Sequence, residues 1–207
     1  MANSFSAIKI FCSATTLKTH SPHYDSLCVE RCVSIRHPKA SDATAFLQAV
    51  QESRSLHGRW SQPPNTPAKF KAYLERYALE MHRSFLVINR KDRQLAGVIN
   101  INNIIRGHFH SASLGYYAFA GHEGRGRMRT ALQLVLLYVF DRLRLHRLEA
   151  NIQPGNIASI ALAKGAGFVY EGYSKRFLKI AGRWRDHERW ALLREDFRAR
   201  KIPLKIT

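Results

Sequence analysis

Acidic side chains are scarce in this sequence, and the shortage is its first informative feature. The 207 residues include 15 Asp and Glu against 33 Lys and Arg, which gives a formal net charge of +18. A field of that sign raises the encounter rate with polyanions. A basic surface that only keeps the protein soluble is the alternative interpretation. The length and the hydrophobic content of 45% suit one domain with a sizeable core.

Cysteines and long apolar runs are also few. Cys12, Cys28 and Cys32 are an odd number with no cluster at metal-ligand spacing, so we expect reduced thiols and no metal site. No run approaches the ~18 apolar residues that a membrane span needs. Residues 1–27 contain no arginine, and Lys9 breaks their longest apolar stretch, which disfavours transit and signal peptides. We therefore expect a soluble cytoplasmic protein with no membrane contact.

The common nucleotide-binding motifs are absent too, but a glycine loop is present. There is no G-x-x-x-x-G-K-[ST], and Gly121, Gly124 and Gly126 do not space as G-x-G-x-x-G. The loop follows an apolar stretch, residues 114–119, that predicts a strand buried on both faces. It precedes residues 132–143, whose apolar side chains fall on one helical face. An arginine-rich glycine loop at a helix N-terminus can bind phosphate. A plain strand-to-helix turn is the alternative interpretation.

Several motifs in order carry a family resemblance. The loop resembles the acetyl-CoA pyrophosphate loop of the GNAT acyltransferases, which follows a Q/R-x-x-G-x-G/A pattern between a strand and a helix. Asn156-Ile-Ala-Ser159 and Gly167-Phe168 resemble the N-x-x-S and GF signature of the same superfamily. Further stretches resemble its RimJ/RimL-type branch, which includes ribosomal-protein alanine N-acetyltransferases: residues 105–110, 114–116, 145–150 and 182–187. The likeness runs from about residue 33 to about residue 197.

The pattern along the chain predicts an α/β protein, a mixed sheet of about seven strands with flanking helices. The resemblance implies the GNAT acyl-CoA N-acyltransferase fold. We divide the chain into an N-terminal extension with little expected order (1–27), the GNAT domain (28–200) and a C-terminal tail (201–207). Strands are expected at 29–35, 85–88, 95–105, 114–119, 147–152, 168–180 and 184–193, and helices at 43–50, 70–81, 132–143 and 156–164.

The aromatic stripe of the second helix, from Phe70 through Tyr73 and Tyr77 to Met81, is typical of a core face. In GNAT enzymes, however, the first two helices line the acceptor groove. Both interpretations of the stripe stay open from the sequence.

The resemblance also assigns the co-substrate, acetyl-CoA. The strand before the glycine loop and the next strand would splay apart, and backbone groups of Tyr117, Ala118 and Phe119 would bind pantetheine in the gap. Asn156 would contact the coenzyme, although it could merely cap its helix. The pyrophosphate would lie on the loop, formed by Gly124, Arg125, Gly126, Arg127 and Met128.

Three positions depart from the superfamily pattern. Glu123 stands where Gln or Arg is usual, and its charge opposes a pyrophosphate unless it turns away or pairs with a nearby arginine. Met128 replaces the common Gly or Ala. Ala163 occupies the position of the tyrosine that many GNAT enzymes use as general acid. The proton donor must therefore differ from that tyrosine.

Ser159 is the candidate acid, because RimL-type enzymes place a serine there beside the thiol; a helix serine bonded to its own backbone is the alternative. For the base, the RimL-type glutamate position is Leu178, and the acidic position of the fourth strand is Ser113. His110 and Glu149 are weak base candidates, each with an alternative structural role. An α-amine has a pKa near ~8, so a water chain would also suffice.

Three function classes follow. The first is an N-terminal acetyltransferase that acts on the α-amine of a ribosomal or other protein. The second is an acetyltransferase of small amines such as polyamines, which would need an acceptor cleft lined by carboxylates. The third is a ribosome-associated binding protein with weak or lost catalysis. The positive charge favours contact with coenzyme A and with ribosomal RNA.

Overall fold

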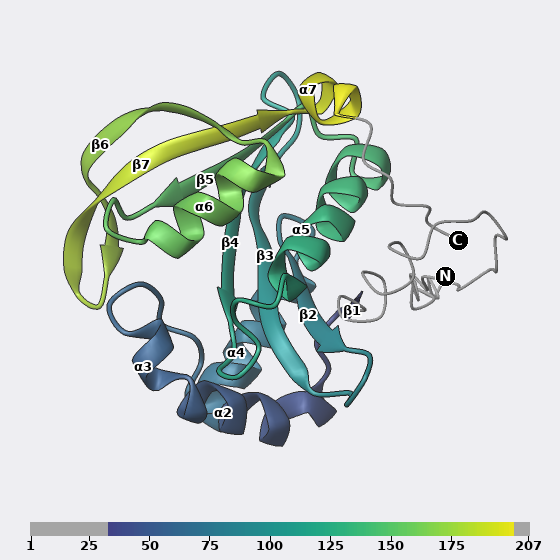
Figure 1. Cartoon of the computed structure of the whole chain (residues 1–207), viewed down its shortest axis with the longest axis vertical. Coiled ribbons are helices and arrows are strands. Elements are labelled where there is room, and N and C mark those ends of the chain that lie inside the picture. The colour runs from purple at the N-terminus through teal and green to yellow at the C-terminus, as the bar shows by residue number, and fades with distance from the viewer. Residues whose placement is uncertain (1–32, 201–207) are drawn as a thin grey trace, which may run out of the picture.

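One seven-stranded sheet runs through the computed structural model, which describes residues 33–200 (Figure 1). The strand order is β1-β2-β3-β4-β5-β7-β6, and neighbours are antiparallel except β4 and β5. This confirms the predicted mixed α/β sheet. The strands are β1 Val33–Arg36, β2 Arg83–Asn89, β3 Leu95–Ile105, β4 Ser111–Ala118, β5 Arg147–Ile152, β6 Val169–Ile180 and β7 Arg183–Leu193.

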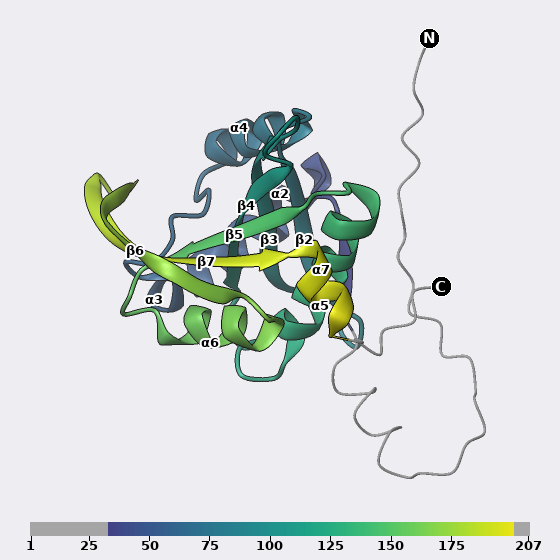
Figure 2. The same ribbon diagram turned by 90° about the horizontal axis from the view of Figure 1, so that it is seen from above.

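Helices cover both faces of the sheet, and α4 and α6 lie on opposite sides of it (Figure 2). The helical segments are η1 Ala40–Asp42, α2 Ala43–Glu52, α3 Arg54–His57, α4 Pro67–Ala78, α5 Arg127–Leu137, η2 Tyr138–Arg142, α6 Ile157–Ala166 and α7 Arg194–Ala199. None of the helices within residues 33–200 is long and apolar enough to cross a membrane.

Two apolar cores result, one on each face. The larger one packs fully buried side chains of α5 and η2, such as Leu132, Leu136 and Phe140, against the sheet. The smaller one joins α2 and α4 to the sheet through Phe46, whose ring centroid lies 4.7 Å from Phe70 and 5.7 Å from Phe119. This smaller core fixes α2 and α4 beside the end of β4, where the site lies.

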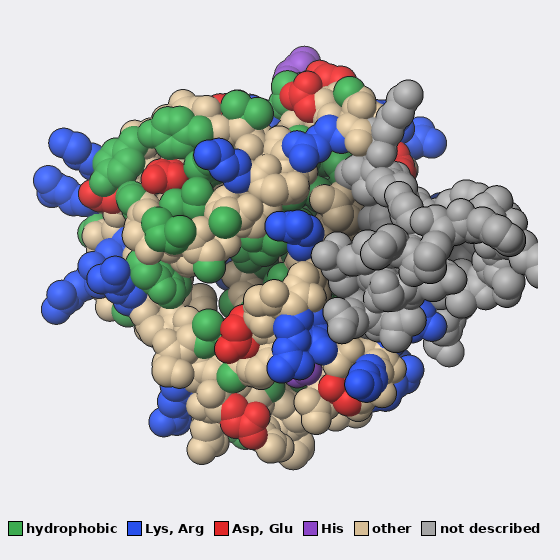
Figure 3. All heavy atoms as spheres, viewed as in Figure 1, with side chains coloured by type: hydrophobic (Ala, Val, Ile, Leu, Met, Phe, Trp, Pro, Cys, Tyr) green, Lys and Arg blue, Asp and Glu red, His purple; other side chains and the backbone are tan. Residues whose placement is uncertain are grey.

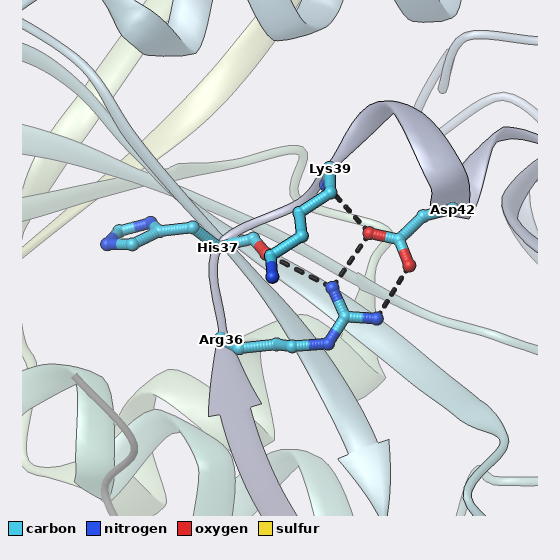
Figure 4. Close-up of polar contacts among 4 residues, drawn as sticks. All are labelled: Arg36, His37, Lys39 and Asp42. Carbon is cyan, nitrogen blue, oxygen red and sulfur yellow. Dashed lines mark hydrogen bonds and ion pairs between the residues drawn. The ribbon is translucent and has the colours of Figure 1, made fainter. Parts of the chain in front are cut away.

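The start of α2 is held by an ion pair to the first strand (Figure 4). Both carboxylate oxygens of Asp42 accept hydrogen bonds from the Arg36 guanidinium, at 2.6 and 2.7 Å, and the Lys39 N–H donates to Asp42 at 2.7 Å. Burial opposes ionisation of Asp42, but these bonds outweigh it and lower the pKa of the carboxyl. Asp42 thus satisfies a free donor at the helix N-terminus and connects it to β1.

The parallel neighbours β4 and β5 separate along their length. Their register runs only from Ser111↔Arg147 to Leu114↔Ala150, whereas β4 stays paired with β3 as far as Ala118. The last residues of β4 are therefore unpaired on the β5 side. The splayed strands that the resemblance implies are present.

The boundaries of four predicted elements need correction. The strand predicted at 114–119 spans Ser111–Ala118, and Tyr116 to Ala118 are half-buried because their β5 side is open. The helix predicted to residue 143 changes from α-helix to π-helix at Tyr138. Met81 lies beyond α4 and is 53% exposed, because the backbone turns extended at Leu79. The helix predicted to end at residue 164 continues to Ala166.

Other boundaries agree within a residue or two. The first predicted strand is described from Val33 onward, and it ends one residue later than predicted. The cysteines, the extension at 1–27 and the tail at 201–207 lie outside the described residues.

Candidate active site

The glycine loop adopts a backbone that glycine alone accommodates without strain. Gly121, Gly124 and Gly126 have φ values of 78°, 70° and 73°. Gly126 is the N-cap of α5, and no side chain caps that helix. The first N–H groups of α5 are therefore free to bind an anion, which the helix dipole also attracts.

Arg127, the first residue of α5, is also placed to bind an anion. It is 8% exposed, and its Nε and Nη1 have no hydrogen-bond partner among residues 33–200. A buried guanidinium without a partner is costly, and a phosphate would satisfy it with charge-assisted bonds. The residues present therefore fit a pyrophosphate. Glu123 lines the same region but is exposed, so its carboxylate can face water.

A pocket of about 630 Å³ leads from this loop along the open edge of β4 to α6. It contains every predicted coenzyme residue except Phe119, which is 1% exposed and packs in the smaller core. Its lining includes Tyr117, Ala118, Gly124, Arg125, Gly126, Arg127, Met128, Asn156 and Ser159. A single cavity thus brings together the glycine loop, the unpaired strand edge and the signature helix.

The open edge of β4 presents a backbone donor to this pocket. Phe119 N–H bonds to Ala96 O on the β3 side at 3.0 Å. Because backbone groups alternate sides along a strand, the N–H and C=O of Tyr116 and Ala118 point to the β5 side. The Ala118 carbonyl accepts a hydrogen bond from His57 Nε2 at 2.9 Å. The Ala118 N–H is left facing the gap.

Asn156 and Ser159 lie across the pocket from that edge. Asn156 caps α6, and its Oδ1 accepts from the Ser159 N–H at 3.2 Å, so the capping role is present alongside its place in the lining. The Ser159 carbonyl accepts from the Tyr116 hydroxyl at 2.7 Å. The Ser159 hydroxyl has no hydrogen bond within the described chain and does not bond back to its own helix. Ala163 is fully buried.

The two predicted base candidates lie elsewhere. His110 precedes β4, at the opposite end of that strand from Ala118, and its carbonyl accepts from the N–H groups of His146 and Arg147. Glu149 on β5 accepts from Arg147 Nε at 2.8 Å, and Arg147 also pairs with Glu171. Neither His110 nor Glu149 lines either of the two pockets at the end of β4.

The second of these pockets, about 670 Å³, lies between α3, α4 and the proline-rich segment 61–65. It meets the first pocket at His57, Ser61 and Tyr117, which line both. Tyr73 and Tyr77 of α4 line its wall, so the aromatic stripe belongs partly to a groove. Burial raises the pKa of Tyr77 to about 12.

The charge of this second pocket is entirely positive. Arg54, Lys69 and Arg76 line it, and the described lining residues include no carboxylate. On the face shown in Figure 3, Lys and Arg side chains are likewise spread widely over the surface. The second pocket therefore disfavours a polycation and favours a neutral or anionic molecule.

His57 is a residue shared by both pockets that the sequence did not single out. It is 6% exposed, and its ring packs edge-on against Tyr117 with centroids 5.1 Å apart. No motif surrounds it, and α3 is only four residues long. The one available signal was its place between the two predicted helices that the resemblance assigns to the acceptor groove, just before the proline-rich segment.

A glycine loop at a helix N-terminus, an unpaired strand edge and an adjoining second pocket fit a transferase that brings a long phosphate-bearing co-substrate against an acceptor. Comparison with known proteins specifies which kind. The model of the acetyltransferase (GNAT) domain matches residues 33–169. The chain belongs to the GNAT acetyltransferase family and is an acetyl-CoA-dependent N-acetyltransferase.

Several relatives show how far the likeness extends. The probable N-acetyltransferase YjcK of Bacillus subtilis is 37% identical over 80% of this chain and 96% of its own length. The [ribosomal protein uS5]-alanine N-acetyltransferase of Escherichia coli is 37% identical over 55% of this chain and 58% of its own length. The spermidine N(1)-acetyltransferase of Vibrio cholerae is 26% identical over 73% of this chain and 88% of its own length.

Among solved structures, Mycobacterium smegmatis RimJ in complex with CoA-disulfide has a TM-score of 0.74 and 26% identity. The match covers 85% of this chain and 86% of that one. Both ribosomal-protein and small-amine acetyltransferases are thus similar to this protein.

Proposed function

We propose that the protein acetylates the α-amine of a protein N-terminus, with an alanine at the start of a ribosomal protein as the expected acceptor. The observation that carries this proposal is the second pocket, whose charged lining residues Arg54, Lys69 and Arg76 are all cations. An N-terminal amine brings one positive charge and becomes neutral near its pKa of ~8. The similarity to the uS5-alanine N-acetyltransferase supports this choice.

The same pocket argues against a polyamine acceptor. Like unit charges at about 8 Å in water repel by about 0.5 kcal/mol, a cost that an N-terminal amine meets for one charge and a polyamine for each of its ammonium groups. A polyamine carries several such groups and finds no carboxylate among the described lining residues. The similarity to spermidine N(1)-acetyltransferase nevertheless makes a polyamine the second acceptor to test.

A binding protein without catalysis is the third class. The positive charge of the chain and the expected repulsion between Glu123 and a pyrophosphate favoured this class. Glu123 is exposed, however, and the buried Arg127 is available for phosphate. In the proposed reaction the Ala118 N–H polarises the thioester carbonyl, Asn156 contacts the coenzyme, and the Ser159 hydroxyl protonates the departing thiolate. We place this activity in the cytoplasm, where the basic surface can also draw the protein to the ribosome.

The test is an acceptor panel. The protein is incubated with acetyl-CoA, a thiol reagent and, in separate reactions, Ala-starting peptides, Ser-starting peptides, spermidine and an aminoglycoside. We expect release of coenzyme A with the peptides and, by mass spectrometry, one acetyl group on the α-amine. Faster turnover of spermidine would assign the protein to the small-amine class. No release with any acceptor would favour the binding protein.

A further inference from the structure

We propose that His57 is the general base that accepts the proton of the acceptor amine. Of the residues that line both pockets, His57, Ser61 and Tyr117, it alone has a side chain that can take up a proton near neutral pH. Transfer requires the amine and the thioester to meet where the two pockets join. This proposal rests on N-acetyltransferase activity and not on which amine is the acceptor.

The hydrogen bond of His57 defines its tautomer. Its Nε2 lies 2.9 Å from the Ala118 carbonyl, which can only accept, so the proton is on Nε2 and the lone pair is on Nδ1. Nδ1 has no hydrogen bond within residues 33–200. The bond also places the ring on the open edge of β4, beside the Ala118 N–H that faces the gap. A proton acceptor and an oxyanion donor are therefore neighbours on the same peptide edge.

The backbone around His57 is held firmly. The fully buried Ser53 donates to Ala49 O at 2.6 Å and accepts from the Ala120 N–H at 2.9 Å, which ties α2 to the segment after β4. The His57 N–H then bonds to Ser53 O at 2.9 Å. A base positioned by such contacts keeps its geometry during the reaction.

No neighbouring group competes for the role. The Tyr117 hydroxyl is buried without a partner in the described chain, and burial raises its pKa well above its ordinary value, so it stays protonated. His122 lines only the first pocket, at the phosphate end among arginines. The other ionisable side chains of the two pockets are Arg54, Lys69, Tyr73, Arg76 and Tyr77 on the acceptor side, and Tyr116, Glu123, Arg125, Arg127 and Arg129 on the coenzyme side.

The protonation state of His57 suits a base. Burial lowers its pKa, and the bond to the Ala118 carbonyl only partly offsets this. The ring is therefore mostly neutral at pH 7, with its Nδ1 lone pair available.

The reaction balances with His57 in this role. His57 Nδ1 takes one proton from the acceptor ammonium group, and the freed nitrogen lone pair attacks the thioester carbonyl carbon. The C–N bond forms, the C–S bond breaks, and the thiolate leaves with the sulfur electron pair. The thiolate gains the surplus proton of the new amide nitrogen through Ser159 or water, and His57 returns its proton to solvent. The products are the amide, the free thiol and one proton.

Two matched variants test the proposal. His57→Gln keeps an N–H donor for the Ala118 carbonyl and removes the base. His187→Asn is the control, because His187 is also buried, bonds to the Arg185 carbonyl at 2.9 Å through Nδ1, and lines neither pocket. Coenzyme A affinity and the melting temperature are measured for both, so that a folding defect is recognised.

We expect His57→Gln to lower kcat by about 10²-fold or more, with coenzyme A affinity unchanged. The variant should regain rate as pH rises through about 8, where the amine loses its own proton, whereas the parent kcat/KM should level off with an apparent pKa below about 6.5. His187→Asn should keep the parent rate and profile. A His57→Gln variant with the parent rate and pH profile would overturn the proposal.

If His57→Gln fails to fold, the pH dependence of kcat/KM of the parent protein decides the question. A kcat/KM that follows only the pKa of the acceptor amine would overturn the role of His57. The ratio of variant to parent is measured on whichever acceptor the parent uses. A parent that prefers spermidine therefore refutes the proposed acceptor and still allows the base to be judged.

Discussion

Replacement of Arg127 by methionine should change stability and coenzyme binding in opposite directions. Arg127 is buried, and its Nε and Nη1 lack partners in the described chain. Each unpaired buried donor costs about 1–3 kcal/mol, so Arg127→Met, which keeps much of the apolar side-chain length, should make the coenzyme-free protein more stable by about 2 kcal/mol. The arginine is retained, on this view, because a phosphate satisfies it.

The same substitution removes a charge-assisted bond to that phosphate, which is worth about 1.5–3 kcal/mol, or about 10–150-fold in affinity. Urea unfolding without coenzyme A and calorimetry with coenzyme A measure the two effects separately. Arg125→Met is the control, because Arg125 lines the same pocket but is exposed and should change stability little. Unchanged affinity in Arg127→Met, or a loss of stability with it, would refute the assignment of Arg127 to the pyrophosphate.

Three further predictions concern single side chains. Glu123→Gln should tighten coenzyme A binding by about fivefold or less, because the carboxylate is exposed; weaker binding by calorimetry would mean that Glu123 orders the arginines. Ser159→Ala should lower kcat by about 10²-fold with unchanged coenzyme affinity, and single-turnover kinetics at the parent rate would make water the proton donor. Asp42→Asn should lower the free energy of unfolding by about 1 kcal/mol at pH 7. Since the folded pKa of Asp42 is lowered, this loss should shrink as pH falls through that pKa; an equal loss at pH 7 and pH 3 in denaturant titrations would contradict it.

That the residues predicted to bind coenzyme lie together could be anticipated from the sequence, because they belong to local motifs. A glycine loop, the helix N-terminus after it and the cap of the signature helix are contiguous segments, and the motif spacing already carries their geometry. Gly124, Gly126, Arg127 and Asn156 accordingly line one pocket. Phe119 does not, because it follows the end of β4, its N–H bonds to Ala96 O on the β3 side and its side chain packs inside the smaller core.

The second pocket could not be predicted because it depends on contacts between distant segments. His57 bonds to Ala118, 61 residues later, and Ser53 bonds to Ala120, 67 residues later. Nothing near His57 in the sequence signals this contact. His110 was a candidate by residue type and by its place in the stretch shared with the family, and Glu149 by its place on the fifth strand. His110 precedes β4 and Glu149 pairs near the start of β4, so both lie away from the pockets at the other end of that strand.

Two boundaries deviate because the apolar pattern of a sequence does not report edge pairing or helix type. The half-buried residues at the end of β4 are apolar, as in a strand covered on both sides, but the separation of β5 leaves one edge open. In the same way, residues 138–142 keep helical periodicity while their backbone forms a π-helix, which apolar spacing does not distinguish from an α-helix.

The proposed reaction moves an acetyl group from acetyl-CoA to the α-amine of a protein N-terminus. The most direct measurement is mass spectrometry of an Ala-starting peptide after incubation with the protein and acetyl-CoA, beside an identical peptide whose α-amine is blocked and whose lysine is free. We predict one added acetyl group on the first peptide and none on the second. Acetylation of the blocked peptide at its lysine, or preferential acetylation of spermidine in competition, would contradict the claim.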